Sequence, residues 1–208
     1  GQRVNFCVPT GNFGDILAAY YAKRMGLPVG KLICASNRND VLTDFLRTGV
    51  YDRNRPFHCT MSPSMDILVS SNLERLLFDL SGENDAEVRE YMAKLARDYE
   101  VSDAIKAALR EQYWGGCCGE EETARTIGKY YREKGYLIDT HTAVAAAVME
   151  QYRAETGDGT VTVFVSTASP YKFCASVLPA IGEEPKGDGV ELLEQLHEVS
   201  GVKVPERL

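Results

Sequence analysis

The chain has 208 residues, of which 44% are hydrophobic and 25% are charged, a composition typical of soluble globular proteins. This length fits one large domain or two small ones. The formal net charge of −7 argues against nucleic acid or an anionic membrane as the main partner. The sequence contains neither a visible signal peptide nor an apolar run of membrane-spanning length.

Six cysteines are spread along the chain without the spacing of a metal site. They are Cys7, Cys34, Cys59, Cys117, Cys118 and Cys174. The adjacent pair Cys117-Cys118 lacks CxxC spacing and a nearby histidine, so we expect neither zinc nor a disulfide framework. Free thiols of this kind indicate a reducing compartment, and we expect a cytoplasmic protein. A buried-looking strand follows Gly1 almost at once, so we expect the native N-terminus to lie further upstream.

Residues 1–61 have the strand and helix alternation that is typical of a parallel sheet. The pattern predicts strands at 4–8 and 31–35 and helices at 15–25 and 40–47. Gly26 and Pro28 end the first helix, and Gly49 ends the second. We therefore predict an α/β fold with a parallel sheet.

Residues 62–120 are predicted to form a helical block without strands. Ser62 and Pro63 are typical of the first positions of a helix, and we predict a long helix there. Its apolar stripe would be Met65, Leu68, Val69, Leu73, Leu76 and Leu80. One further helix is predicted behind the capping pair of Asn84 and Glu87, and Tyr99 would lie on its apolar face. Another is predicted at 102–109. The stretch 112–119 is predicted to be glycine-rich and irregular.

The remaining residues return to the α/β pattern. Helices are predicted at 121–134, 142–155 and 171–181, and the clearest strand of the chain at 161–166. We assign 121–182 to the rest of the sheet domain and 183–208 to a C-terminal helix and tail. Asp188 and Glu191 are typical of a capping pair that opens this last helix.

A first candidate site is Thr10-Gly11-Asn12-Phe13-Gly14-Asp15, between a predicted strand and a predicted helix. Glycines there let backbone N–H groups point inward, and the helix dipole adds positive potential, which suits a bound phosphate. The GK[ST] ending of a P-loop and the GxGxxG fingerprint are both absent. The alternative is a tight turn that uses glycine for its geometry alone.

A second candidate site is Ser166-Thr167-Ala168-Ser169-Pro170-Tyr171-Lys172-Phe173, which follows the clearest strand. Ligands of open α/β sheets bind at the carboxyl ends of strands. A hydroxyl there can hydrogen-bond a ring nitrogen, and Lys172 can meet an anion. The alternative is that Ser166 or Ser169 caps a helix and that Lys172 is solvated.

Two further segments carry polar residues beside predicted helices. Asp139-Thr140-His141-Thr142 is interpreted as an N-cap cluster that opens an alanine-rich buried helix, with His141 as a structural histidine. In the segment 62–75, Ser71, Asn72 and Arg75 fall beside the apolar stripe, and arginine can bind a phosphate in bidentate fashion. A solvated helix face is the alternative for that segment.

Taken in order, these four segments resemble the threonine synthase family. Residues 8–15 are similar to the family's cofactor-phosphate loop. SPSMDI at 62–67 and SSNLER at 70–75 are similar to its SPSMDI…SSNFER helix, with Leu73 where phenylalanine is common. DTHTAVA at 139–145 is similar to its DPHTAVA element, and 166–173 to its T-A-[SH]-P-x-K-F element. The four matches lie at family-like spacing and run from about residue 4 to residue 181.

The resemblance implies the fold of type II enzymes that use pyridoxal 5'-phosphate (PLP). It also implies the lyase reaction of threonine biosynthesis, in which O-phospho-L-homoserine and water give L-threonine and phosphate. The implied cofactor-binding residues are Gly11, Asn12, Phe13, Gly14, Asp15 and Thr167. Thr167 would face the pyridine nitrogen, where a neutral hydroxyl favours β/γ chemistry over transamination. The residues implied near the substrate phosphate are Ser71, Asn72, Arg75 and Lys172.

The family's Schiff-base lysine lies in an N-terminal segment of the Asn-Thr-x-Ala-x-Lys-Asp type. None of the nine lysines here has that context: Lys23, Lys31, Lys94, Lys106, Lys129, Lys134, Lys172, Lys186 and Lys203. That lysine carries the cofactor and moves protons during the reaction. We therefore expect no catalytic residue in this chain, a missing N-terminal part of the same protein as its partner, and no activity for the chain alone.

Two other functions stay open. One is a different type II PLP lyase, related to cysteine synthase or the tryptophan synthase β chain, although the segments 62–75 and 84–109 argue against it. The other is a non-catalytic α/β module that binds a phosphate-containing ligand.

Overall fold

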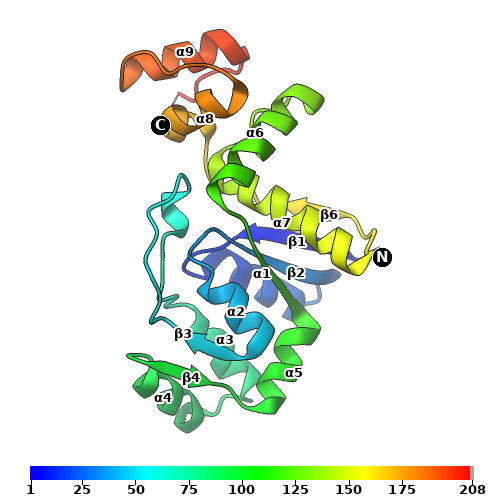
Figure 1. The fold of residues 1–208 in the computed structure, drawn as a ribbon. Helices are drawn as coiled ribbons and strands as arrows, with labels where there is room; N and C mark the ends of the chain where they lie inside the picture. The colour runs from blue at the N-terminus through cyan, green and yellow to red at the C-terminus, as the bar shows by residue number, and fades with distance from the viewer. Residues whose placement is uncertain (207–208) are drawn as a thin grey trace.

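A computed structural model of the chain describes residues 1–206 and has a four-stranded sheet at its centre (Figure 1). The strand order is β5-β2-β1-β6, and every neighbouring pair is parallel. The strands are β1 (Val4–Pro9), β2 (Val29–Ser36), β5 (Tyr113–Cys117) and β6 (Thr162–Phe164). The predicted α/β fold with a parallel sheet is confirmed.

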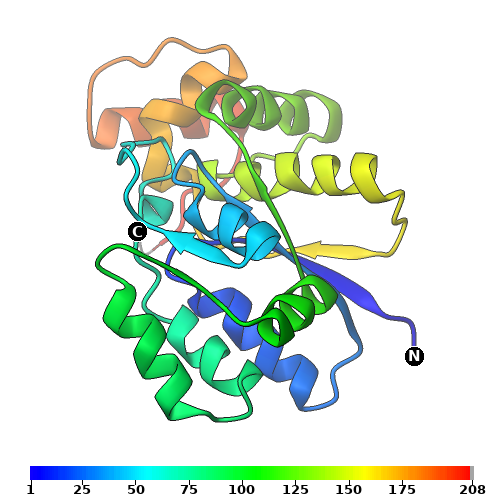
Figure 2. The ribbon, with the colours of Figure 1, turned by 60° about the horizontal axis from the view of Figure 1, so that its bottom comes forward.

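Helices surround this sheet and extend beyond one end of it (Figure 2). The α-helices are α1 (Gly14–Arg24), α2 (Val41–Thr48), α3 (Leu73–Leu80), α4 (Asp85–Lys94), α5 (Asp103–Gln112), α6 (Glu120–Lys134), α7 (Thr140–Thr156), α8 (Cys174–Ile181) and α9 (Val190–Ser200). Two short 3-10 helices are η1 (Pro63–Met65) and η2 (Pro170–Phe173). None of the helices in the described residues is long and apolar enough to cross a bilayer.

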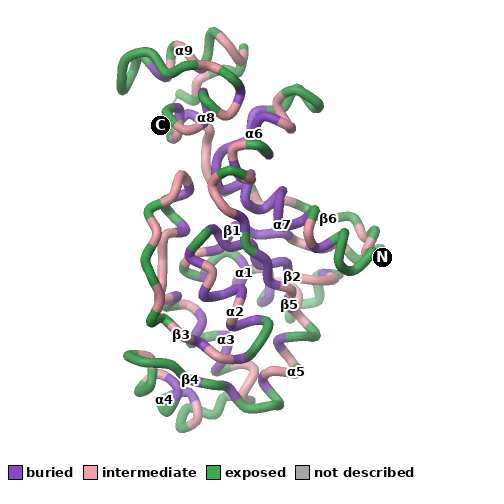
Figure 3. The backbone as a smooth tube through the Cα atoms, in the orientation of Figure 1, coloured by how far each residue is buried: buried purple, intermediate pink, exposed green. Residues whose placement is uncertain are grey.

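Successive side chains of a strand point to opposite sides of the sheet. Both faces of the two central strands are buried because helices cover the sheet on both sides. On β1 and β2, Val8 and Leu32 face a core shared with α1, α2, α3 and α5. Their neighbours Cys7 and Ile33 face the other side, where the small residues of α7 cover the sheet. A third apolar cluster joins α6, α7, α8 and α9 beyond the sheet. Figure 3 shows this burial as purple along most of β1, β2 and α7.

Local signals placed most helices of the sheet domain correctly. The helices predicted at 15–25, 40–47, 121–134 and 142–155 match α1, α2, α6 and α7 to within two residues at each end. Gly49 and Gly135 follow two of these helices in the left-handed conformation, with φ of 81° and 62°. These glycines stop the helices because an L side chain is strained there.

The long helix predicted from Ser62 is wrong. The chain forms only η1 there, and α3 begins at Leu73. Between them, the Ser70 hydroxyl donates to the Gly11 carbonyl, and the Ser71 N–H donates to Asn12 Oδ1. Polar groups that find such partners elsewhere compete with helix formation, which explains the break.

The prediction that 62–120 lacks strands is also wrong. The stretch expected to be irregular forms β5, and an antiparallel pair joins β3 (Val50–Asp52) to β4 (Asp98–Glu100), which contains Tyr99. A Cβ on Gly116 would lie 2.9 Å from Val148 on α7, and one on Gly115 would lie 3.2 Å from Thr43 on α2. These glycines therefore let two helices pack closely on β5. The division of the chain at residues 61, 120 and 182 stays a prediction.

Boundaries in the last third of the chain are shorter than expected. The strand predicted at 161–166 is limited to β6, and the helix predicted at 171–181 is divided into η2 and α8. The Asp188 N–H donates to Glu191 Oε2 at 3.3 Å, although the helix itself begins after Gly189. Residues 207 and 208, at the end of the predicted tail, lie outside the described residues.

The predicted cap at Asn84 gives a simple stability test. Its side chain accepts a hydrogen bond from the Glu87 N–H at 3.2 Å and is exposed to solvent. We expect Asn84→Ala to lower the free energy of unfolding by about 1 kcal/mol, the usual effect of losing an N-cap. Urea unfolding followed by circular dichroism measures the change, and an unaltered midpoint would contradict the role of this cap.

Candidate active site

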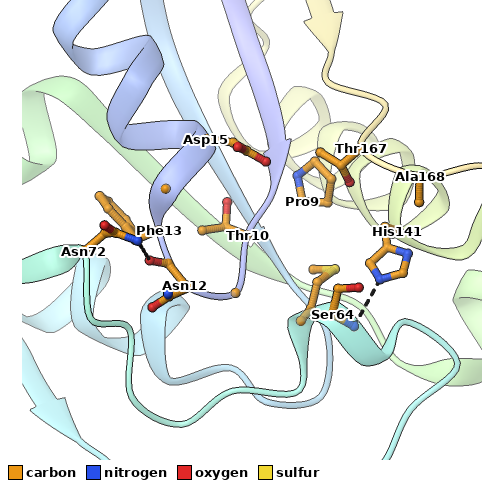
Figure 4. A pocket seen from close by; sticks show the side chains of 13 residues that line it. Pro9, Thr10, Asn12, Phe13, Asp15, Ser64, Asn72, His141, Thr167 and Ala168 are labelled. Carbon is orange, nitrogen blue, oxygen red and sulfur yellow. Dashed lines mark hydrogen bonds between the residues drawn. The ribbon is translucent and has the colours of Figure 1, made fainter.

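A cavity of about 320 Å³ lies where β1 ends and α1 begins (Figure 4). Its lining residues are Pro9, Thr10, Gly11, Asn12, Phe13, Gly14, Asp15, Ser64, Met65, Asn72, His141, Thr167 and Ala168. The cavity therefore lies at the carboxyl end of a central parallel strand, the usual ligand position in such sheets. All four motif segments contribute to its wall.

The loop after β1 leaves the N-terminus of α1 open toward this cavity. Phe13 is the N-cap, in the left-handed conformation at φ 65°, and its side chain makes no capping hydrogen bond. Its ring is instead buried 5.7 Å from the ring of Tyr113. The first N–H groups of a helix have no partner within the helix, so this uncapped end suits an anion.

The two glycines of the loop do different things. A Cβ on Gly11 would lie 2.9 Å from the Ser64 carbonyl oxygen, so the backbone of η1 rests directly on this residue. A Cβ on Gly14 would meet only Asn72 Nδ2, at an ordinary 3.5 Å. Gly11 is thus required by close packing, whereas Gly14 keeps the entrance of the helix N-terminus free of a side chain.

The segment before α3 holds this loop through four hydrogen bonds. The Ser70 hydroxyl donates to the Gly11 carbonyl at 2.6 Å. The Ser71 N–H and hydroxyl donate to Asn12 Oδ1 at 2.6 and 2.9 Å, and Asn72 Nδ2 donates to the Asn12 carbonyl at 2.9 Å. The loop at 10–15 and the segment 62–75 therefore form one unit.

The predicted substrate-binding residues are not all at the cavity. Asn72 lines it, and Arg75 Nη1 donates to Asn72 Oδ1 at 2.7 Å. The arginine itself lines a separate depression with Tyr21 and Phe78, and Ser71 is not among the lining residues. Lys172 is exposed and lines another depression beside α9. The substrate role of these residues stays a prediction.

Asp139 confirms the predicted N-cap cluster of α7. Its carboxylate accepts hydrogen bonds from the N–H groups of His141 and Thr142 at 2.8 and 3.3 Å. It also contacts His141 Nδ1 at 3.1 Å and accepts from the Thr142 hydroxyl. The Thr142 hydroxyl lies 3.1 Å from that of Ser166, which connects α7 to the segment containing Thr167.

The charge of Asp139 is stabilised inside the protein. Its side chain has no exposed surface, and burial by itself raises the pKa of a carboxyl group. Hydrogen bonds from the His141 side chain, from Thr142 and from the His141 N–H more than offset burial, so the pKa of Asp139 lies below its usual value. The group is therefore ionised at neutral pH.

The sequence pattern indicates only a structural histidine at position 141, whereas the structure places His141 at the cavity. Its side chain is 1% exposed and lies against the Phe173 ring, with 4.9 Å between ring centroids. Nε2 accepts a hydrogen bond from the Ser64 N–H at 3.3 Å (Figure 4). The sequence gives no signal for this contact, since its partner lies 77 residues away.

The segment 166–173 contains both a capping residue and residues that line the cavity. Ser169 accepts from the Tyr171 N–H at 3.3 Å, which confirms the capping interpretation for that residue. Thr167 and Ala168 line the cavity opposite the phosphate-type loop (Figure 4). None of the described lysines is among the lining residues, and the described part of the chain contains no cluster of metal-ligating side chains.

Comparison with known proteins agrees with this geometry. Residues 142–206 match the family model for "Threonine synthase, C-terminal". Threonine synthase from Pseudomonas aeruginosa is 44% identical over 187 residues, which are 88% of this chain. The PLP-bound threonine synthase from Brucella melitensis is 42% identical, covers 93% of the chain and superposes with a TM-score of 0.82. The chain is homologous to part of the threonine synthases. Its fold is accordingly that of type II PLP enzymes.

The match covers only part of each relative. The human protein "Threonine synthase-like 1" is 42% identical over 87% of this chain, but the chain spans just 24% of that protein. The corresponding share is 39% for the Pseudomonas threonine synthase and 42% for the Brucella structure. The chain thus spans 24% to 42% of the length of these three relatives.

Proposed function

We propose that the protein to which this chain belongs is a PLP-dependent lyase that converts O-phospho-L-homoserine and water into L-threonine and phosphate. The observation that carries this proposal is the single cavity lined by all four motif segments at the N-terminus of α1. Homology to threonine synthases supports the same reaction. The chain spans less than half of these relatives, so the reaction is proposed for the whole protein.

The residues at the cavity fit the cofactor's phosphate. The N-terminus of α1 is uncapped by any side chain, and the outer face of Gly14 is open. We propose that the backbone of residues 11–14 donates hydrogen bonds to this phosphate, aided by the helix dipole. Asp15 belongs to the same first turn, where an acidic side chain is favourable to the helix itself.

The other end of the cavity suits the cofactor ring. PLP supplies an electron sink when it is bound, and the protein orients it. We propose that the Thr167 hydroxyl hydrogen-bonds the pyridine nitrogen from the segment after β6. A hydroxyl has no negative charge with which to hold a proton on that nitrogen. This arrangement favours replacement chemistry at the β and γ carbons.

The substrate phosphate is proposed to bind near Asn72, the one member of the predicted set that lines the cavity. Arg75 bonds the Asn72 side chain and is the nearby cation in the same segment. Ser71 fixes Asn12 and so acts on the loop. We propose Lys172 for the rim of the site, although its side chain lines a separate depression beside α9.

We infer that a lysine from another segment of the same protein completes the site. Such a lysine is needed to hold the cofactor covalently and to move protons, and none lines the described cavity. We further propose a cytoplasmic protein of threonine biosynthesis that interacts with neither nucleic acid nor membrane. Its acidic balance, with a net charge of −7, supports the absence of polyanionic partners.

Assay of the full-length protein with PLP tests the proposal. We expect equal amounts of phosphate and threonine to be released from O-phospho-L-homoserine, with no comparable turnover of serine, O-acetylserine or indole with serine. Turnover of those substrates instead would favour another type II lyase. PLP binding without turnover of any of them would favour a non-catalytic module.

The isolated 208-residue chain offers a separate prediction. We expect no threonine formation above background, since no lysine lines its cavity. Addition of PLP should also give no borohydride-fixed adduct within the cavity, as measured by mass spectrometry of peptides. Threonine formation by the chain alone would contradict this part of the account.

A further inference from the structure

The main-chain N–H of Ser64 donates to His141 Nε2 at 3.3 Å, and both residues line the cavity (Figure 4). Its imidazole is 1% exposed, lies 4.9 Å from the Phe173 ring and has the ionised Asp139 on its Nδ1 side. Such an enclosed ring has no freedom to turn away. The contact is therefore a fixed link between α7 and η1.

The proton positions on the ring follow from its neighbours: Nε2 faces the Ser64 N–H, and Nδ1 lies 3.1 Å from Asp139 Oδ1 and 3.3 Å from the Thr140 hydroxyl oxygen. The Ser64 N–H is a donor, so Nε2 must present its lone pair. The carboxylate of Asp139 is an acceptor, so Nδ1 must carry the proton. The imidazole is thus neutral with the proton on Nδ1, and Asp139 selects this tautomer.

The segment that His141 holds forms a wall of the cavity. Ser64 and Met65 both line the cavity. Their backbone rests against Gly11, so a Cβ at position 11 would clash with that backbone. The far side of η1 is tied separately, since Asp66 Oδ1 accepts from Asn37 Nδ2 and from the Thr60 hydroxyl at 2.8 and 2.7 Å. On the side that faces α7, η1 is held by the hydrogen bond from the Ser64 N–H to His141 Nε2.

We propose that His141 is a positioning residue whose neutral Nε2 holds the backbone of residues 64 and 65 against the phosphate loop and thereby sets the shape of the cofactor cavity. This assignment rests on the proposed function, because it makes PLP the ligand that this shape fits. His141 acts through Ser64 and takes no proton from the substrate. Asp139 acts in turn through His141.

Two substitutions separate positioning from general packing. Glutamine at position 141 keeps a side-chain acceptor in the place of Nε2, whereas asparagine keeps only a donor in the place of Nδ1. In the full-length protein we expect His141→Asn to raise the Kd for PLP on the order of 10-fold, the effect of one lost buried hydrogen bond. His141→Gln should restore most of that affinity.

Calorimetric titration of PLP into both variants, with circular dichroism to verify folding, measures this difference. Equal weakening by both substitutions would overturn the proposal, because a purely packing role does not distinguish the two side chains. Unchanged affinity in both would overturn it as well. If the wild-type protein binds PLP but makes no threonine, the proposed function fails while the positioning role survives.

The tautomer gives a second readout, measured on the wild-type protein, that needs no cofactor to bind. In the wild-type protein labelled with ¹⁵N-histidine, we expect the His141 signals of a protonated Nδ1 and an unprotonated Nε2 at neutral pH. The signal is assigned by its absence from the His141→Gln protein. Protonation of Nε2, alone or together with Nδ1, would overturn the proposed contact with Ser64.

Discussion

We expect replacement of Gly14 by aspartate to weaken PLP binding by at least about 100-fold. The new carboxylate would stand at the uncapped N-terminus of α1, where the cofactor phosphate is proposed to bind. Two like charges about 4 Å apart repel by about 4 kcal/mol near a protein surface, which is enough for this loss. Calorimetric titration of PLP into the full-length protein measures it.

The control for this experiment is Gly14→Asn, which has nearly the same size without the charge. A Cβ at this position meets only Asn72 Nδ2 at 3.5 Å, so both substitutions fit without displacing the backbone. We expect the asparagine variant to lose far less affinity than the aspartate variant. Equal affinities for the two variants would show that charge at this position is irrelevant and would contradict the phosphate assignment.

Removing the carboxylate of Asp139 should be the most destabilising single change at the site. Asp139→Ala deletes the N-cap of α7 and removes the charged acceptor of the buried His141 Nδ1–H and Thr142 hydroxyl. These two groups keep the hydroxyls of Thr140 and Ser166 as neighbours. The lost cap costs about 1 kcal/mol and the lost buried hydrogen bonds to a charged group about 1–3 kcal/mol more. We expect a total loss of about 3 kcal/mol in the free energy of unfolding. Urea denaturation measures this loss, and the exposed cap variant Asn84→Ala serves as its matched control.

The effect of Asp139→Ala should depend on pH in a defined direction. The pKa of Asp139 is lowered in the folded protein, so its ionised form stabilises the fold. That contribution is complete above the pKa of the unfolded state, roughly 3.9, and is lost as the pH falls through the lower folded value. The difference between wild type and variant should therefore be constant near neutral pH and shrink only below about pH 4. A difference that grows on acidification would contradict the assignment.

Features that depend on neighbouring residues were predictable from the sequence. The end of α6 at Gly135 and the caps at Asn84 and Asp139 are each set by a few adjacent residues. The phosphate-type loop is likewise contiguous, and the structure places all of residues 11–15 at one cavity. Local chemistry was therefore sufficient for these parts of the fold and the site.

Features that depend on distant partners were not predictable. β5 was expected to be irregular because Gly115 and Gly116 weaken a strand, yet they are required by the close approach of α2 and α7. The long helix after Ser62 fails because Ser70 and Ser71 bond to the loop 59 residues before them. The role of His141 was hidden in the same way, since Ser64 becomes its neighbour only in the folded chain.

The central claim is that the loop at residues 11–14 holds the phosphate of PLP. A crystal structure of the full-length protein grown with PLP tests it most directly. The account predicts that the phosphate lies at the N-terminus of α1, accepts hydrogen bonds from the backbone of Gly11 to Gly14, and leaves the pyridine nitrogen facing Thr167. A cofactor phosphate bound elsewhere, with this cavity left to solvent, would contradict it.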